Sequence, residues 1–194
     1  MYRSFIKRGI DIVIAFTTLV ILSPLLLIVY IAVKTDSKGP FFFFQERIGY
    51  KGVVFKIYKI RTMTDKKRTN HQEVLKDNAE VTRVGYFLRR FKIDELPQII
   101  NVLKGEMSVV GPRPGLPDQI NSYNEDGKMR LFVKPGLTGL AQVNGNIYLS
   151  WPERWKLDRC YVENVSLLMD IKIISKTILI VCFGEEKFLK KSNA

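Results

Sequence analysis

The longest apolar stretch of the chain lies near its N-terminus. It runs from Ile12 to Val33, over 22 residues, without a charged side chain. A helix needs roughly 20 apolar residues to cross a bilayer. A cleaved signal peptide has a shorter apolar core and then a small-residue cleavage site, and no such site follows here. The pattern therefore predicts a helix that enters a membrane.

Ser23 and Pro24 stand in the middle of this stretch. Proline lacks a backbone donor and clashes with the carbonyl four residues earlier, that of Val20, so the helix must bend or break there. The Ser23 hydroxyl is placed to bond a carbonyl that the proline frees. Each half of the helix rises about 15 Å, which is half the hydrocarbon thickness. Two shapes fit this length: a kinked span, and a hairpin that enters and leaves by one face.

The charges beside the apolar stretch favour the hairpin. Basic side chains occur on both sides of it: Arg3, Lys7, Arg8, Lys34 and Lys38. Flanks rich in lysine and arginine stay in the cytoplasm, and a span would leave one of these flanks outside. We therefore predict that residues 1–36 form a re-entrant helix hairpin broken at Ser23-Pro24. Residues 37–194 are predicted to form the cytoplasmic domain.

The next segments alternate between strand and helix patterns. Residues 41–63 are aromatic and β-branched, which predicts short strands with a turn from Gly49 to Gly52. The aromatic run at 41–44 fits either core packing or a girdle at the lipid headgroups. Apolar positions from Val84 to Phe91 have helical spacing, and a second helix is expected after Pro97, through residues 99–103.

The second half of the chain holds two segments rich in glycine and proline, 105–117 and 134–146, which we expect to be structured loops without regular elements. The chain from Trp151 onward has a helical pattern. Residues 166–183 are apolar on most faces, which favours a helix lying along the membrane surface, with a buried core helix as the alternative. These patterns together predict a mostly helical α+β protein with short strands and interfacial amphipathic helices.

The charge balance points to anionic partners. Lysine and arginine total 31 against 19 acidic residues, a formal charge of +12. Nucleic acid, an anionic membrane and phosphorylated substrates all fit this balance. The chain has no base-reading motif, and nucleic-acid binding would not account for the apolar stretch, so we expect no nucleic acid. The basic end formed by Lys187, Lys190 and Lys191 favours anionic lipids.

The cysteines and the histidine do not indicate a metal or a nucleophile site. Cys160 and Cys182 are 22 positions apart, which matches no metal motif, and we interpret them as reduced. His71 lies in a polar stretch and is expected to be an exposed loop residue. The chain also lacks G-x-G-x-x-G, P-loop and Asp-x-Asp motifs, so the commonest routes to nucleotide binding are missing.

The most informative polar feature is the adjacent pair Asp94–Glu95. Four cations surround the pair in the sequence: Arg83, Arg89, Arg90 and Lys92. A solvated, salt-bridged helix face is the ordinary explanation of such a pattern. Pro97 places the pair near a helix break, however, and Arg113 between two prolines offers a stiffly held guanidinium that matches phosphate oxygens. A carboxylate acts as a nucleophile toward phosphorus when cations and a metal lower the repulsion. Oxygen ligation of this kind suits Mg²⁺.

At these residues the chain resembles the bacterial sugar transferase family of monotopic polyprenyl-phosphate phosphoglycosyl transferases, and among them the small members. The resemblance rests on four segments in order: QERIGYKGVVFKIYKIRTM (45–63), IDELPQIINVLKGEMSVVGPRP (93–114), KPGLTGLAQVNGN (134–146) and SLLMDIKI (166–173). It begins at KRGIDI (7–12), includes the Ser-Pro pair, and extends to about Lys187. It therefore covers nearly the whole chain.

This resemblance implies a reaction and a location. Asp94 attacks the β-phosphate of a UDP-sugar, UMP leaves, and polyprenyl (undecaprenyl) phosphate then takes the sugar-phosphate from the aspartate. Glu95 is the supporting acid/base or metal-side residue, and Mg²⁺, held by the pair, is required. The re-entrant helix anchors the protein in the cytoplasmic leaflet of the bacterial inner membrane. The reaction is the first membrane step of a glycoconjugate pathway.

The resemblance also implies roles for further residues. Three cations are assigned to phosphate contacts: Lys59, Arg89 and Arg113. Three other polar residues are expected to be walls of the site or partners of its residues: Gln142, Asp158 and Asp170. The chain departs from the usual motifs at Ile60, at Lys134 in place of arginine, and at Asn146 in place of arginine. Lys134 lacks the bidentate fork that an arginine would offer a phosphate, and Asn146 leaves substrate choice open.

Several questions stay open at this level. The sequence does not identify the sugar, the pathway or the oligomeric state, a homo-oligomer included. A membrane adaptor without catalysis is the main alternative to a transferase, but it leaves Asp94–Glu95 and the GPRP segment unexplained. Asp94→Asn separates the two readings, because an adaptor would be unaffected.

Overall fold

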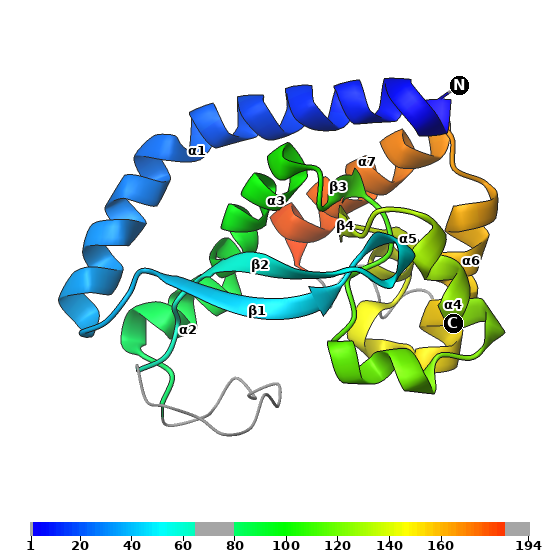
Figure 1. Ribbon diagram of the computed structural model, residues 1–194. Helices are drawn as coiled ribbons and strands as arrows, with labels where there is room; N and C mark the ends of the chain where they lie inside the picture. Colours follow the sequence, from blue (N-terminus) through cyan, green and yellow to red (C-terminus); the bar gives the residue numbers. More distant parts are fainter. Residues whose placement is uncertain (1, 65–79, 185–194) are drawn as a thin grey trace.

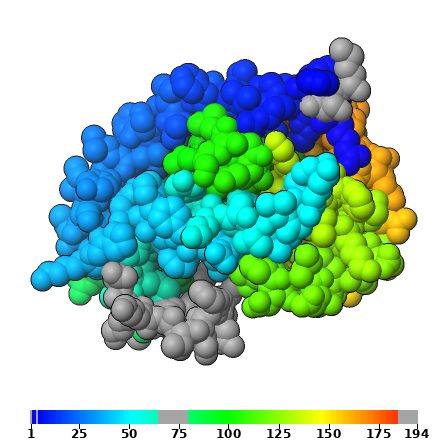
Figure 2. Space-filling model, viewed as in Figure 1, coloured from blue at the N-terminus to red at the C-terminus, as the bar shows by residue number. Residues whose placement is uncertain are grey.

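The structure, a computed structural model, describes residues 2–64 and 80–184. His71 and the basic end at Lys187, Lys190 and Lys191 lie outside the described residues. A long N-terminal helix, α1, crosses the top of the molecule in Figure 1 and then bends down its left side. A β-hairpin runs beneath it across the middle of the face shown in Figure 2.

Helix α1 spans Lys7–Asp36 and follows a π-helical turn at Tyr2–Ile6. The chain stays helical through Pro24, and its direction changes midway (Figure 1). Ser23 Oγ donates a hydrogen bond to the Val20 carbonyl at 2.8 Å, which confirms the predicted compensation for the lost proline donor. Helix α1 is long and apolar enough to cross a membrane by length and composition, and only 11% of its most apolar window is buried.

The first half of α1 is fastened to the globular domain by polar contacts. Asp11 is buried and accepts hydrogen bonds from Ser108 Oγ at 2.8 Å and from the Val109 amide at 3.0 Å. Arg8 donates to the Val102 carbonyl at 2.6 Å and to the Leu103 carbonyl at 2.9 Å. The two Arg8 bonds therefore reach carbonyls in the last turn of the helix that ends at Lys104.

The last turns of α1 are fastened to the same domain. Val29 and Val33 pack in a small core with Ile60 and Leu88. Past the helix end, Arg61 donates to the Ser37 carbonyl at 2.7 Å and to that of Lys38. Both ends of α1 therefore contact one domain, and the apolar side chains between them are largely exposed.

The hairpin consists of β1 (Phe42–Ile48) and β2 (Val54–Ile60), which pair antiparallel around a turn at Tyr50–Gly52. The predicted strands and turn are confirmed. Phe41 packs on the core beside α1, which confirms core packing for that residue. Phe43 and Phe44 are half exposed, and their place at the lipid headgroups stays a prediction.

Helices α2 (Arg83–Arg90) and α3 (Ile99–Lys104) confirm the predicted helical segments. Between them lies a 3₁₀ helix, η3 (Ile93–Gln98), which contains Pro97. Lys92, with a φ of 56°, stands in the left-handed region and turns the chain from α2 into η3. The carboxylate pair therefore sits on a short turn between two helices.

The segments rich in glycine and proline are more regular than predicted. Strand β3 (Ser108–Val110) pairs parallel with β4 (Gly136–Thr138), and a short helix, α5 (Leu140–Val143), follows. The prediction of loops without regular elements was wrong here. The glycines let the two segments approach closely, because a Cβ on Gly136 would lie 2.1 Å from the Gly111 amide nitrogen.

The rest of the domain is helical: η4 (Pro117–Ser122), α4 (Glu125–Met129), η5 (Arg130–Phe132), η6 (Asn146–Tyr148), α6 (Trp151–Glu163) and α7 (Leu167–Phe183). Helix α7 buries Asp170 and Ile173 but exposes Leu168, Ile178 and Val181, so it is not a fully buried core helix. The described chain is mostly helical with two small sheets, as the predicted α+β class requires.

Candidate active site

Glu95 is held by two cations from distant parts of the chain. Arg113 Nη1 donates to Oε2 at 3.0 Å and Arg113 Nη2 to Oε1 at 2.6 Å, while Lys59 Nζ, from β2, donates to Oε1 at 3.0 Å. The two Arg113 bonds form a bidentate fork, the strongest arrangement for a carboxylate. Burial alone would raise the pKa of Glu95, but Arg113 and Lys59 outweigh it and hold that pKa well below its usual range.

Asp94 has the opposite electrostatic environment. Burial, followed by the charge of Glu95, raises its pKa to about 6, although Lys59 and Arg89 partly oppose the rise. The two neighbouring carboxyls thus differ in pKa: that of Glu95 is lowered and that of Asp94 is raised. Such a separation is typical of sites that carry out acid–base or nucleophilic chemistry.

Arg89 approaches the pair from α2. Its Nε donates to Thr62 Oγ1 at 2.9 Å, which fixes the side chain against the segment that follows β2. Helix α2 can lie this close because Gly85 has no side chain: a Cβ there would lie 2.0 Å from the Thr62 carbonyl oxygen. The three predicted phosphate-binding cations therefore all come to the carboxylate pair, two by direct bonds to Glu95 and Arg89 through its charge.

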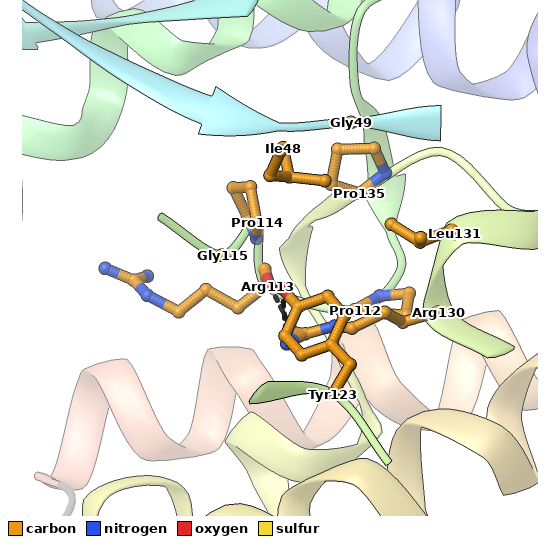
Figure 3. Close-up of a pocket in the computed structure, with 10 residues that line it drawn as sticks. All are labelled: Ile48, Gly49, Pro112, Arg113, Pro114, Gly115, Tyr123, Arg130, Leu131 and Pro135. Carbon is orange, nitrogen blue, oxygen red and sulfur yellow. Dashed lines mark hydrogen bonds between the residues drawn. The ribbon is translucent and has the colours of Figure 1, made fainter. Parts of the chain in front are cut away.

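A small pocket lies on the other side of the Arg113 backbone (Figure 3). The Arg113 guanidinium points away from this pocket, whereas its main chain borders it. The free volume of about 10 Å³ is close to the smallest that holds a water molecule. That volume is too small for a nucleotide.

The other predicted site residues make their bonds elsewhere. Gln142 Nε2 donates to the Leu137 carbonyl at 3.2 Å. Asp158 is buried in α6 and pairs with Arg130 at 3.2 Å; burial raises the pKa of Asp158 to about 6 although Arg130 opposes it. Asp158 belongs to the support of the Arg113 segment, as Arg130 also donates to the Arg113 carbonyl.

Asp170 fastens the N-terminus of the chain to α7. It accepts hydrogen bonds from Tyr2 Oη at 2.5 Å and Lys7 Nζ at 2.7 Å on Oδ2, and Tyr161 Oη lies 2.8 Å from Oδ1. Three donors thus surround the buried Asp170 carboxylate. Through Tyr2 and Lys7 it positions the first turn of α1. Its predicted role at the site stays a prediction.

Two of the three departures from the usual motifs, Lys134 and Asn146, lie away from the carboxylate pair. Lys134 stands beside Arg8 at the end of α3: a Cβ on Gly105 would lie 3.5 Å from Lys134 Nζ and 3.4 Å from Arg8 Nη2. Burial, and then the charge of Arg8, lowers the pKa of Lys134. Asn146 begins η6 in the left-handed region, with a φ of 46°.

Two buried arginines were missed by sequence reasoning. Arg47 in β1 donates to the Pro114 carbonyl at 3.3 Å, and Arg130 donates to the carbonyl of Arg113. Arg47 shares a face of the hairpin with the buried Phe55 and Ile57. A charged residue on the apolar face of an alternating strand was therefore an available signal.

The residues present fit Mg²⁺ with some restriction. Within residues 2–64 and 80–184, no three His, Cys, Asp or Glu side chains gather into a metal-binding group. Mg²⁺ is commonly held by one or two carboxylates together with substrate phosphates and water. Asp94 meets that requirement. Glu95 already accepts three hydrogen bonds, two on Oε1 and one on Oε2, which leaves one lone-pair site on Oε2 for a metal.

The long apolar helix α1 is typical of membrane-associated proteins. The carboxylate pair with its neighbouring cations is typical of a site for phosphate groups. The chain belongs to the bacterial sugar transferase family, whose model matches residues 2–184. It is similar to an uncharacterized sugar transferase, EpsL, of Bacillus subtilis, with 42% identity over 93% of this chain and 89% of that protein.

Two further relatives extend the comparison. The exopolysaccharide production protein ExoY of Sinorhizobium fredii is 39% identical over 94% of this chain and 88% of that protein. The undecaprenyl-phosphate galactose phosphotransferase of Salmonella typhimurium is 39% identical over 91% of this chain but only 40% of that protein. The similarity thus covers almost all of this chain, in relatives of two different lengths.

Proposed function

We propose that this protein transfers a sugar-1-phosphate from a UDP-sugar to undecaprenyl phosphate through a phosphosugar-aspartyl intermediate, with release of UMP. The observation that carries the proposal is the carboxylate pair. Lys59 and Arg113 donate hydrogen bonds to Glu95 and hold it ionised, whereas these bonds do not go to Asp94. A relative from Klebsiella pneumoniae, 41% identical over 181 residues, is named a UDP-glucose:undecaprenyl-phosphate glucose-1-phosphate transferase. Its name supports the same class of donor and acceptor here.

Asp94 is the nucleophile in this proposal. In the first step a carboxylate oxygen of Asp94 forms a bond to the β-phosphorus, and the bond from that phosphorus to the bridging oxygen breaks. The bridging oxygen keeps the electron pair and leaves with UMP. In the second step an oxygen of undecaprenyl phosphate attacks the same phosphorus and releases Asp94. The sugar–oxygen bond stays intact throughout, as a covalent mechanism of this kind requires.

The cations provide electrostatic stabilisation of the phosphates. Lys59 uses one ammonium donor on Glu95, and Arg113 uses two of its guanidinium donors. A lysine has three donors, so Lys59 retains capacity for phosphate oxygens. Glu95 therefore aligns the donors before substrate arrives, which is how a preorganised site lowers a barrier.

We propose Mg²⁺ as the cofactor, held by Asp94 and Glu95 together with substrate oxygens. When bound, Mg²⁺ neutralises charge on the diphosphate. Asp94 has the freer carboxylate of the two for this role, as the bonds from Lys59 and Arg113 to Glu95 show. Removal of Mg²⁺ with EDTA is expected to abolish turnover, and full activity in EDTA would contradict this part of the proposal.

We also propose that α1 enters the cytoplasmic leaflet of the inner membrane and returns to the same face. The support is the attachment of both its ends to one domain: Asp11 binds Ser108 near the start, and the chain just past its end binds Arg61. A straight span would separate these ends by a bilayer. The exposed apolar side chains of α7, such as Leu168 and Val181, are proposed to lie at the membrane surface, where anionic lipids meet the basic protein.

The catalytic proposal is tested by capture of the intermediate. The protein is incubated with a UDP-sugar and Mg²⁺ in the absence of acceptor, and its intact mass is measured. We expect an added sugar-phosphate that maps to Asp94 and is absent from Asp94→Asn. Wild-type protein that turns over with acceptor but never carries the adduct would rule out the aspartyl intermediate.

The sugar and the topology need separate experiments. A screen of UMP release over a panel of UDP-sugars with undecaprenyl phosphate identifies the donor. For the topology, single cysteines at residues 2 and 38, in a variant that lacks Cys160 and Cys182, are labelled in intact membranes. Both are expected to react only from the cytoplasmic side, and opposite sidedness would mean that α1 spans the membrane.

A further inference from the structure

The segment that carries Arg113 is held in place through its main-chain carbonyls, which accept hydrogen bonds at successive residues. The partners are the Gly136 amide on Pro112, the Arg130 guanidinium on Arg113, the Arg47 guanidinium on Pro114 and the Ile48 amide on Gly115. Prolines at 112 and 114 already restrict φ on both sides of Arg113. The backbone at Arg113 is therefore fixed from several elements at once.

Arg130 is the donor that acts on Arg113 itself. Its side chain is 7% exposed and pairs with Asp158, whose side chain is 3% exposed. The guanidinium also lies over the Tyr123 ring, 5.3 Å from its centre. In Figure 3 the Arg130 side chain reaches the Arg113 main chain from within the pocket, while the Arg113 side chain points the opposite way. A buried ion pair is weak support for stability, because desolvation offsets the attraction.

We propose that Arg130, held in place by Asp158, is a positioning residue for the transfer reaction. The path runs from Asp158 in α6 through Arg130 to the Arg113 carbonyl, and from there along the Arg113 side chain to Glu95. This inference rests on the proposed function of the site. Its consequence is geometric: a bidentate fork needs two N–O contacts at once, so a small shift of the Arg113 backbone breaks at least one of them.

The test begins with a variant that retains the fold. Arg130→Met alone would leave Asp158 buried without its partner, which is strongly destabilising. The double variant Arg130→Met/Asp158→Leu removes both charges, and such apolar replacements are often neutral for stability. We expect it to melt near the wild-type temperature and to lose kcat by roughly 100-fold, the scale that a 1 Å misplacement of a catalytic group produces. Wild-type kcat in the folded variant would overturn the proposal.

A second cycle separates positioning from a general loss of structure. The same double variant is made in an Arg113→Ala background. If Arg130 acts through Arg113, the double variant costs little further kcat once the Arg113 side chain is gone. A further loss as large as that in the wild-type background would show that Arg130 and Asp158 act through something other than Arg113.

Arg159→Met serves as the matched control. Arg159 joins α4 and α6 through Asp126 at 2.9 Å and Glu163 at 2.7 Å, close to Asp158 in the chain, but these bonds do not reach the Arg113 segment. We expect its kcat to be unchanged. Loss in the control equal to that in the double variant would attribute the effect to helix packing and overturn the proposal.

Failure of the positioning role of Arg130 can be told apart from failure of the proposed transferase function. Wild-type protein that releases no UMP from any UDP-sugar would refute the function. The positioning inference is then decided by hydrogen exchange in peptides that cover residues 110–116. Faster exchange there in Arg130→Met/Asp158→Leu, but not in Arg159→Met, supports it, and unchanged exchange overturns it.

Discussion

Replacement of Asp94 by asparagine is expected to stabilise the protein while it removes the proposed nucleophile. In the native site Asp94 is partly buried and stands next to the ionised Glu95, which together raise its pKa from 3.8 to about 6. The ionised form of Asp94 is therefore unfavourable in the folded state. Asparagine is nearly isosteric with aspartate and does not ionise, so it avoids this penalty.

The size of the effect follows from the change in pKa. A rise of about 2 units corresponds to about 3 kcal/mol of unfolding free energy, at about 1.4 kcal/mol per unit. Because Asp94 is only partly buried, solvent screens some of this, and we expect about 1–3 kcal/mol. For a chain of this size, 1 kcal/mol moves the melting temperature by about 2–4 °C. The variant is therefore expected to melt several degrees above wild type at neutral pH.

The dependence on pH has a definite sign. A carboxyl whose folded pKa is raised favours folding fully below its unfolded pKa, near 3.8, and this contribution is lost as pH rises through about 6. The advantage of Asp94→Asn is thus largest above pH 7 and disappears near pH 4. The assay is thermal melting in detergent with EDTA from pH 4 to 8, since a bound cation would itself favour ionised Asp94.

An exposed aspartate provides the control. Asp118 lies on η4 and is exposed, and Asp118→Asn is expected to leave the melting temperature unchanged at every pH. Equal stability of Asp94→Asn and wild type at pH 8 would refute the reasoning, because it would mean that ionised Asp94 is not held against an electrostatic penalty.

Three further changes have expected outcomes. The kcat/KM for UMP release should fall as pH decreases through about 6, because protonated Asp94 is not a nucleophile, and a flat profile from pH 5 to 8 would contradict this. Arg113→Lys loses the bidentate fork on Glu95 and should lower kcat by roughly 10-fold or more in the same assay, whereas wild-type kcat would contradict a need for the fork. Asp11→Ala leaves the buried Ser108 hydroxyl and Val109 amide without their acceptor and should destabilise the protein by about 1–3 kcal/mol in thermal melts, with Asp118→Ala as the neutral control.

Patterns that depend on near neighbours were predictable from the sequence. The long apolar helix, the Ser23 bond to Val20, the hairpin and the helix before Phe91 all follow from periodicity and turn residues within one element. The parallel pairing of β3 with β4 was not predictable in this way. It joins two segments far apart in the chain, and their glycines look like loop signals until a second backbone is seen to pack on them.

The candidate site shows the same division. The resemblance drew attention to Asp94, Glu95, Lys59 and Arg113, but the fork and its distances exist only after β2, η3 and the Arg113 segment meet. Arg130 carries no local signal of its role. Its importance lies in a bond to a main-chain carbonyl, and any residue type offers such a carbonyl, so no pattern of side chains predicts it.

The sequence by itself determined that the N-terminal helix is long and apolar enough to enter a membrane, that one acidic pair stands among cations, and that the family is that of the bacterial sugar transferases, because these depend on composition, spacing and motif order. Only the tertiary structure decided that both ends of α1 attach to one domain. It also decided that Glu95, rather than Asp94, accepts the hydrogen bonds of Arg113 and Lys59. The two carboxylates are adjacent and chemically alike in the sequence. Burial acts on both, but the fold bonds Arg113 and Lys59 to Glu95 and leaves Asp94 beside the charge of Glu95, and it is this that separates their pKa values.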